Sequence, residues 1–303
     1  MEIEKTREDR GALNRLIYVR DTIYYGVSEP LRLSLVRKRH SKDYKAADNP
    51  LVSVYIPTYN RAELLMQRSV PSVLAQTYKN FELIIVGDHC TDNTEELVNR
   101  INDPRIRFYN LPERRYRYPP TAENHWLAGP VVPANKGLVL VRGKWIARVD
   151  DDDSWTADHL EALLRFAQSG GYEFVSARYM FMRHGKTDVH NGVYARDPYY
   201  TRRKRLPKNT GPLIGGTSTW LYRSYLRFFK YNINCWRKSW NRVNDIDLSQ
   251  RIFYAGARMG FLPKVVSYVF PRPGESTIGV EAYKITAEEK IAHFSFQGSC
   301  HDK

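Results

Sequence analysis

The sequence has few cysteines and no long hydrophobic run. No apolar stretch among its 303 residues approaches the roughly 20 residues that a membrane-spanning helix needs. The first residues also lack the basic and then apolar pattern of a signal peptide. Cys90, Cys235 and Cys300 are too scattered for a disulfide framework or a CxxC metal site. We therefore expect a cytoplasmic protein, with peripheral attachment to the inner face of the membrane as the other option.

Acidic residues are also scarce relative to basic ones. The chain has 47 Lys and Arg against 33 Asp and Glu, which gives a net charge of +14. Such a charge favours anionic partners, namely nucleotides, nucleic acid or an acidic membrane face. The hydrophobic content of 42% is ordinary for a globular protein, so the chain should fold into an enzyme-sized domain with additions.

Residues 1–49 form a polar and basic extension with a predicted helix. Its apolar positions recur at helical spacing; they are Leu13, Leu16, Ile17, Ile23 and Tyr24. Leu31, Leu33 and Leu35 follow, before the basic run at 37–40. Packing on the main domain is the first expectation for this segment, and contact with an anionic membrane surface is the alternative.

From residue 50 onwards, short β-rich runs alternate with helical stretches. The predicted strands are Leu51–Ile56, which is closed by Pro57, Phe81–Val86, Arg105–Leu111 and Lys144–Val149. Predicted helices start near Asn60, with Glu63 in a capping pattern, and at Asp92, and a third contains Leu160, Leu163, Leu164 and Ala167. This alternation predicts an α/β fold with a mainly parallel central sheet covered by helices on both faces.

Polar groups directly follow three of these strands. They are the segment 57–61, the segment 87–89 and the aspartates 150–153. Because ligands bind at the carboxyl ends of parallel strands, the three groups should converge on one crevice. Neighbouring carboxylates repel one another unless a cation or hydrogen bonds compensate, and their oxygens suit Mg²⁺ or Mn²⁺, which can hold a diphosphate. The alternative is a solvated acidic turn before a helix that starts at Asp153 or Ser154.

The stretch from 50 to about 170 resembles the inverting family 2 glycosyltransferases of GT-A fold. The matching segments are Val52–Arg61, Gln76–Val86, Thr91–Thr94 and Arg142–Ile146, the last leading into Asp150–Asp153 and Trp155. The resemblance implies a GT-A-like, Rossmann-related fold with the N-terminal helical extension added. It also implies a nucleotide-sugar-binding half at 50–170 and an acceptor-binding half with a C-terminal segment at 171–303.

The resemblance assigns the nucleotide site. Tyr59 is expected to stack near the base, and Asp88 to accept a hydrogen bond from a uracil-like ring. Pro57, Arg61 and Asp151 are expected to complete the nucleotide-binding surface. The sequence departs from the family at 87–90, where Gly-Asp-His-Cys replaces the usual paired acids and Gly-Ser.

The same resemblance grades the aspartate run. Asp152 is the preferred ligand for Mn²⁺ or Mg²⁺, and Asp150 is its partner, directed toward the ribose or metal-bound water. Asp151 occupies the variable position of the DxD element, and Asp153 is expected to cap the next helix.

A candidate base lies in the second half. Asp245 begins a predicted helix in the position of the family's general base, where the helix dipole favours the ionised form. Asp247 is the reserve candidate for the base. The structural alternative is that Asn244 caps the helix and both aspartates only complement its dipole. Arg272 stands where the family often has a metal-proximal His, and could pair with the diphosphate. The segment 215–220 predicts tight backbone beside a sheet.

These features predict a metal-dependent inverting glycosyltransferase, of hexosyl- or hexosaminyltransferase type. Its donor would be a nucleotide sugar, with UDP favoured, and its acceptor a glycan or lipid-linked saccharide; we do not expect nucleic acid as a partner. The basic clusters 114–117 and 202–205 receive no catalytic role. Two alternatives remain at this point: a sugar-nucleotide nucleotidyltransferase, and a non-catalytic polyanion-binding protein on the same fold.

Overall fold

The computed structural model describes residues 12–40, 49–114, 118–119, 121–195, 211–238 and 242–285. Three of the four residues in the basic cluster 114–117 lie outside these ranges, as does the whole cluster 202–205. Cys300 lies outside them as well.

The four strands predicted from the first half form one parallel block. They are β1 (Val52–Thr58), β2 (Phe81–Gly87), β3 (Ile106–Asn110) and β4 (Trp145–Arg148). β1 pairs with both β2 and β4, and β2 pairs with β3, in parallel register throughout. β1 and β2 are buried along their whole lengths, as continuous apolar runs predict for a sheet covered on both faces.

Beyond β4 the sheet is mixed. Its order is β3-β2-β1-β4-β10-β6-β11-β5, with β7 paired to β6. The strands added here are β5 (Asp153–Trp155), β6 (Phe174–Arg183), β7 (Lys186–His190), β10 (Leu221–Arg223) and β11 (Met259–Val269). β10 is antiparallel to β4 and β6, whereas β6 and β11 are parallel. A separate two-stranded sheet joins β8 (Val193–Tyr194) and β9 (Leu213–Ile214).

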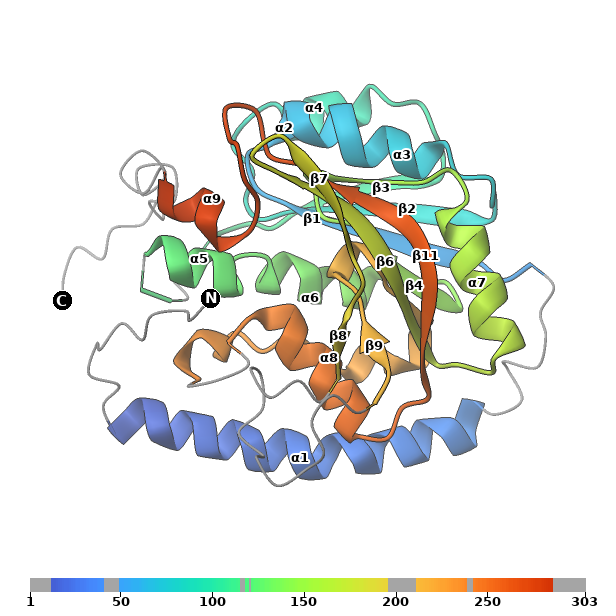
Figure 1. The fold of residues 1–303 in the computed structure, drawn as a ribbon, viewed down its shortest axis with the longest axis vertical. Coiled ribbons are helices and arrows are strands. Elements are labelled where there is room, and N and C mark those ends of the chain that lie inside the picture. Colours follow the sequence, from blue (N-terminus) through green and yellow to red (C-terminus); the bar gives the residue numbers. More distant parts are fainter. Residues whose placement is uncertain are drawn as a thin grey trace.

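Helices cover both faces of the sheet, which confirms the predicted α/β class (Figure 1). One face packs on α2 (Ala62–Leu64), the π-helical η1 (Leu65–Ser69), α3 (Val70–Leu74), α4 (Thr94–Asn99) and α7 (His159–Ser169). The other packs on α5 (Ala122–Ala128), α6 (Val131–Leu140) and α8 (Asn244–Tyr254). Alternate residues of the strands supply the two cores, since Val54 and Ile56 face one cluster and Tyr55 faces the other. The remaining helices are η2 (Thr217–Thr219), η3 (Ser224–Phe228), η4 (Cys235–Arg237) and α9 (Val280–Ile285).

Two expected helix caps are wrong. Asn60 does not cap the first helix: Ala62 N–H donates to the Asp92 carboxylate at 3.1 Å, and Asn60 instead accepts from Thr91 N–H at 2.8 Å. Asp153 lies in strand β5 rather than at a helix start, and α7 begins only at His159. Both errors arise because a distant segment provides a better partner than the local sequence does.

The predicted N-terminal helix is present as α1 (Ala12–His40), which runs along the lower edge of Figure 1 and packs on α8, η3 and η4. Its buried residues are Asp21, Glu29 and Leu33. Apolar residues expected on its inner face, among them Leu16 and Ile23, are exposed instead. Among the described helices, none is both long and apolar enough to cross a membrane.

Candidate active site

A cavity of ≈ 560 Å³ opens at the carboxyl ends of β1, β2 and β4. Every residue predicted for the site lines it: Pro57, Tyr59, Arg61, Asp88, Asp150, Asp151, Asp152 and Asp245. Residues 243–245 and 269–273 close it from the second half of the chain. The expected convergence of strand ends is therefore present, and the cavity lies between the two halves.

Two of the four aspartates are committed to buried partners. Asp151 accepts from Thr58 Oγ1 at 2.8 Å and from Arg61 Nη1 at 2.9 Å. Burial raises the pKa of the Asp151 carboxyl, and Arg61 opposes the shift. Asp153 accepts a hydrogen bond from Ser218, and its pKa is raised well above the ordinary value by burial and by the neighbouring carboxylates Asp152 and Asp150.

Asp150 and Asp152 are the more accessible pair. Their side chains are 32% and 26% exposed, whereas those of Arg148 and Asp151 are 2% and 6% exposed. Asp150 Oδ1 accepts from Arg148 Nε at 3.0 Å and Nη2 at 2.7 Å. Asp152 Oδ2 lies 3.4 Å from Arg61 Nη1. These two carboxylates are thus positioned by cations yet remain open to the cavity.

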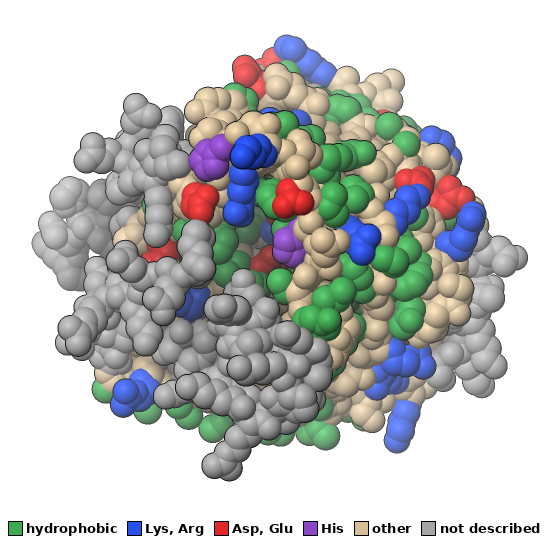
Figure 2. All heavy atoms as spheres, in the orientation of Figure 1, with side chains coloured by type: hydrophobic (Ala, Val, Ile, Leu, Met, Phe, Trp, Pro, Cys, Tyr) green, Lys and Arg blue, Asp and Glu red, His purple; other side chains and the backbone are tan. Residues whose placement is uncertain are grey.

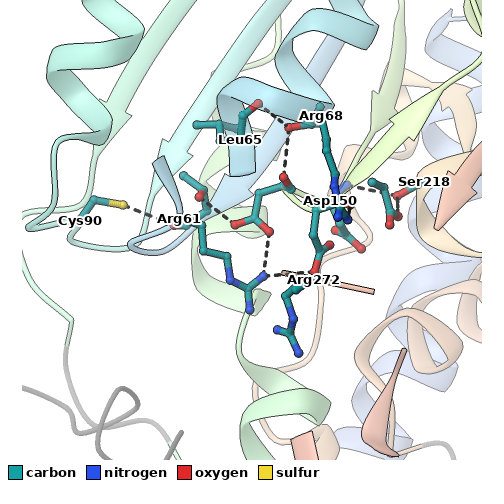
Figure 3. Close-up of polar contacts among 12 residues, drawn as sticks. Arg61, Leu65, Arg68, Cys90, Asp150, Ser218 and Arg272 are labelled. Atoms are coloured by element: carbon teal, nitrogen blue, oxygen red, sulfur yellow. Dashed lines mark hydrogen bonds and ion pairs between the residues drawn. The ribbon is translucent and has the colours of Figure 1, made fainter. Parts of the chain in front are cut away.

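The backbone of the aspartate run is fixed by side chains from two other segments (Figure 3). Arg68 Nη1 donates to the Asp152 carbonyl at 3.1 Å, and the same guanidinium binds the carbonyls of Phe270 and Pro271. Ser218 Oγ accepts from the Asp150 N–H at 3.1 Å. Arg68 belongs to the π-helical turn η1, a distortion that is frequent at functional sites. These contacts attach the backbone of the run to Arg68 and Ser218.

Arg114 joins the two residues predicted to bind the base. Its guanidinium carbon lies 3.7 Å from the centroid of the Tyr59 ring, and its Nε donates to Asp88 Oδ2 at 2.9 Å. Both charged side chains of this pair are almost completely buried. The Tyr59 ring, which is predicted to stack on the nucleotide base, is thus covered by the Arg114 guanidinium, a contact that the sequence did not reveal.

Several cations surround the cavity. Arg61 and Arg272 lie on its wall, and the close-up shows Arg61 extending toward the aspartate run (Figure 3). Arg272 Nε also binds Glu275 at 2.9 Å. Burial lowers the pKa of His125 well below its ordinary value, and Arg114, Arg61 and Arg272 add to that shift. Each of these arginines pairs with a carboxylate that also lines the cavity, so its wall carries paired charges of both signs.

Asp245 and Asp247 differ sharply at the start of α8. Asp245 lines the cavity and accepts from Thr217 Oγ1 at 3.3 Å and from the Ile246 N–H at 2.7 Å. Burial raises the pKa of Asp245, while the Ile246 N–H and the charge of Arg148 lower it. Asp247 is buried in ion pairs with Lys238 and Arg251 and does not line the cavity. It is a structural ion-pair partner, not a reserve base.

Asn244 does not cap α8 with its side chain. Its Nδ2 donates to the Leu127 carbonyl of α5 at 2.9 Å, and no side-chain cap is made at the helix start. The side chain instead links α8 to α5 beside the cavity. At this helix start the Ile246 N–H already donates to the Asp245 carboxylate.

The carboxylates of the site suit a cation bound jointly with a ligand. Within the part of the chain that the structure describes, no three His, Cys, Asp or Glu side chains form a metal-binding group. Asp150 and Asp152 offer accessible oxygens, and Mg²⁺ is commonly held by one or two carboxylates together with substrate phosphates. The donor set therefore fits Mg²⁺ or Mn²⁺ bound with a diphosphate.

Sequence reasoning missed four residues that shape the site: Arg68, Arg114, Arg148 and His125. One signal was available for Arg148, because a charge inside an apolar strand must be paired when it is buried. No comparable signal marks Arg68 or His125, whose roles depend on contacts with distant segments.

Comparison with known sequences gives a consistent family match. Residues 53–119 and 122–229 match the model of Glycosyl transferase family 2. WcaA of Escherichia coli strain K12, named for colanic acid biosynthesis, is 37% identical over 124 residues, covering 40% of this chain and 39% of WcaA. WfgD of Escherichia coli, named a UDP-Glc:α-D-GlcNAc-diphosphoundecaprenol β-1,3-glucosyltransferase, is 30% identical over 184 residues, covering 61% and 65%. The chain thus spans about two fifths of the length of WcaA.

Solved structures support the fold. Staphylococcus aureus TarS 1–349 in complex with UDP-GlcNAc aligns with a TM-score of 0.54 at 18% identity, covering 82% of this chain and 68% of TarS 1–349. The mannosyltransferase PcManGT from Pyrobaculum calidifontis, in complex with GDP-Man and Mn²⁺, aligns with a TM-score of 0.52 at 20% identity, covering 86% and 70%. At these identities the similarity establishes the architecture alone.

Proposed function

The chain belongs to glycosyltransferase family 2, and on that premise we propose that it transfers a sugar from a nucleoside-diphosphate donor, with UDP-sugar favoured, to an acceptor hydroxyl. The reaction would be a single inverting displacement that requires Mn²⁺ or Mg²⁺. The observation that carries this proposal is the single cavity that brings Asp150, Asp152 and Asp245 together.

The donor would lie across the wall formed by the first half of the chain. Tyr59 offers an aromatic face and Asp88 a hydrogen-bond acceptor, which together suffice to orient a pyrimidine. Arg61 and Arg272 supply positive charge beside the diphosphate position. Asp152 and Asp150 would hold the cation, and the cation when bound would neutralise charge on the departing diphosphate.

Asp245 would act as the base. It takes the proton from the acceptor hydroxyl as that oxygen bonds to the anomeric carbon, and the bond from that carbon to the diphosphate breaks with its electron pair on the diphosphate. A carboxylate must be ionised for this task. Arg148 and the Ile246 N–H favour the ionised form against the opposing effect of burial.

The acceptor is proposed to be a glycan or lipid-linked saccharide. WfgD and WfaP are each 30% identical to this chain over the matched regions. Both are named for a diphosphoundecaprenol-linked GlcNAc acceptor and a UDP-Glc donor. The acceptor would approach the side of the cavity that residues 243–245 and 269–273 form, and on this proposal the half at 171–303 would bind the acceptor.

A donor panel tests the proposal. Purified protein is incubated with UDP-, GDP- and dTDP-sugars and Mn²⁺ or Mg²⁺, with and without saccharide acceptors, and the products are separated. Release of nucleoside diphosphate together with a glycosylated acceptor is expected. Release of pyrophosphate would instead identify a nucleotidyltransferase, and binding of polyanions without turnover of any nucleotide sugar would identify the non-catalytic alternative.

A further inference from the structure

Helix α1 presents an apolar stripe to solvent. Leu16, Ile23, Val27, Leu31 and Leu35 are between 59% and 66% exposed. Successive members of this set are seven, four, four and four residues apart, so they lie along one side of a helix of 29 residues, which is roughly 43 Å long. Isolated exposed leucines are common, but an aligned set of this length marks an interaction surface.

The opposite side of α1 attaches the helix to the domain through polar contacts. Buried Glu29 pairs with Arg251 of α8, and buried Asp21 accepts from Asn234 Nδ2 at 3.4 Å. Arg37 binds Glu173 and the Gly256 carbonyl. Among the side chains of α1 that the structure describes, Leu33 is the only apolar one that is fully buried. The helix is therefore reversed relative to an ordinary surface helix, with its charged partners inward and its apolar stripe outward.

The charges on α1 are equally asymmetric. The only acidic residues within 12–40 are Asp21 and Glu29, and both are buried. Arg15, Arg32, Lys38 and Arg39 are exposed. In Figure 2 hydrophobic and basic side chains lie along the lower margin, where α1 runs in Figure 1, and no acidic side chain is visible there. The outward side of α1 thus combines apolar and cationic groups.

We propose that this outward side of α1, the α1 face, binds the surface of an anionic lipid bilayer. An amphipathic helix with an apolar stripe and Lys or Arg beside it lies in the interfacial plane, with the stripe among the acyl chains and the cations at the headgroups. A second copy of the chain is a poorer occupant, because it would bring the same basic residues together without any exposed acid on the α1 face to pair with them.

The position of α1 connects the bilayer to the cavity. α1 packs directly on α8, and α8 carries Asp245 at its start. Arg251 of α8 pairs with both Glu29 of α1 and Asp247 of α8, so the two helices share one ion-pair network. A membrane-bound α1 would hold the cavity close to lipid-linked saccharides; this last step rests on the proposed function.

Vesicle sedimentation tests the α1 face directly. The full chain is mixed with vesicles of phosphatidylcholine alone or of equal parts phosphatidylcholine and phosphatidylglycerol. Binding to the anionic vesicles is expected, and it should weaken at about 1 M salt, where the Debye length is about 3 Å. The double variant Ile23→Gln, Leu31→Gln keeps every charge and should bind at least about tenfold more weakly. Val139→Gln removes an equally exposed apolar side chain from α6 and should bind as the parent does.

Two results would overturn the proposal. One is equal vesicle binding by the double variant, which would mean that net charge alone accounts for binding. The other is a dimer of the parent chain in sedimentation velocity that the double variant converts to a monomer while vesicle binding stays unchanged, which would make the α1 face a contact between copies.

An activity arm separates this proposal from the proposed function. The double variant should retain turnover with a water-soluble acceptor and lose it with a lipid-linked acceptor in anionic vesicles. Absence of turnover by parent and variant with either acceptor, alongside intact vesicle binding by the parent, would refute the proposed function and leave the α1 face standing.

Discussion

The buried guanidinium of Arg148 donates to Asp150 Oδ1 from both Nε, at 3.0 Å, and Nη2, at 2.7 Å. Arg148 lies in strand β4, between the ring of Tyr231 and the carboxylate of Asp150. The same charge lowers the pKa of Asp245 on α8. One cation therefore orients the proposed metal partner and helps to ionise the proposed base.

Arg148→Met should lower transfer by about ten- to a hundredfold, as is typical for partners that orient metal ligands. Removal of the cation raises the pKa of Asp245, and a base works only when ionised, so the acid limb of the pH–rate profile should move to higher pH. The profile is measured for the parent, Arg148→Met and Arg148→Lys. Arg148→Lys should return the acid limb to the pH of the parent. An acid limb at the parent's pH in Arg148→Met would show that Arg148 does not influence the pKa of the base.

Asp245→Asn should reduce transfer by about 10²- to 10⁴-fold while donor binding and melting temperature stay near those of the parent. Asp247→Asn is the matched control, because it should leave Lys238 without its buried carboxylate and Arg251 with Glu29 alone, and so destabilise the fold by about 3 to 5 kcal/mol. Kinetics, donor titration and thermal unfolding distinguish the two. Loss of donor binding in Asp245→Asn would contradict its role as the base.

Asp152→Asn should abolish release of nucleoside diphosphate and weaken the response to added Mn²⁺ or Mg²⁺. The reason is that Asp152 provides an accessible oxygen for the cation, whereas its neighbours Asp151 and Asp153 are engaged with other groups. Asp158→Asn is the control, since Asp158 pairs with Lys264 and does not line the cavity. Metal titrations that give the same curve for both variants would argue against a ligand role for Asp152.

Arg114→Ala should tighten the binding of uridine, which has no phosphate. Arg114 stacks on Tyr59 and pairs with Asp88, so a base that uses both groups must displace it. A desolvated cation–π contact is worth about 2 kcal/mol, which corresponds to a gain of about thirtyfold. Calorimetric titration measures the change. Weaker uridine binding in the variant would show that Arg114 itself helps to hold the base.

Glu29→Gln should flatten the pH dependence of folding stability. Burial raises the pKa of Glu29 from 4.5 to about 7. The charges of Arg251 and Lys238 oppose this shift, and the charge of Asp247 adds to it. Because the folded state binds this proton more tightly, the contribution of Glu29 to stability is fully present below pH 4.5 and is lost as pH rises toward 7. Melting temperatures of parent and variant across this window measure the effect, and parallel curves would refute it.

The aspartate run shows how far local sequence reaches. Its place after a buried strand predicted a site at the sheet edge, and the cavity lies there. The run did not reveal that Asp153 enters strand β5 and accepts from Ser218, because Ser218 lies 65 positions further along the chain. Local sequence favoured a helix cap at Asp153. In the folded chain Asp153 instead binds Ser218, which local sequence cannot identify as a partner.

Helix α1 shows the same limit in another form. Helical spacing of leucine and isoleucine predicted the helix, which is present at Ala12–His40. The expected packing on the main domain is present, but it depends largely on ion pairs of Glu29 with Arg251 and of Arg37 with Glu173, and most of the apolar residues stay exposed. Periodicity defines which residues share a face, whereas the partners available on the domain decide which face is buried.

The sequence by itself determined the α/β class, the four parallel strands, the family and the eight predicted site residues, all of which line the cavity. The class and the strands follow from buried apolar runs, which are local properties of the chain, whereas the family and the site residues follow from the resemblance of its motifs to family 2 glycosyltransferases. Only the tertiary structure decided which aspartates stay accessible, that Asp245 rather than Asp247 faces the cavity, and that Arg68, Arg114 and Arg148 support the site. Those outcomes depend on competition among charged groups far apart in sequence, and burial determines which pairs form.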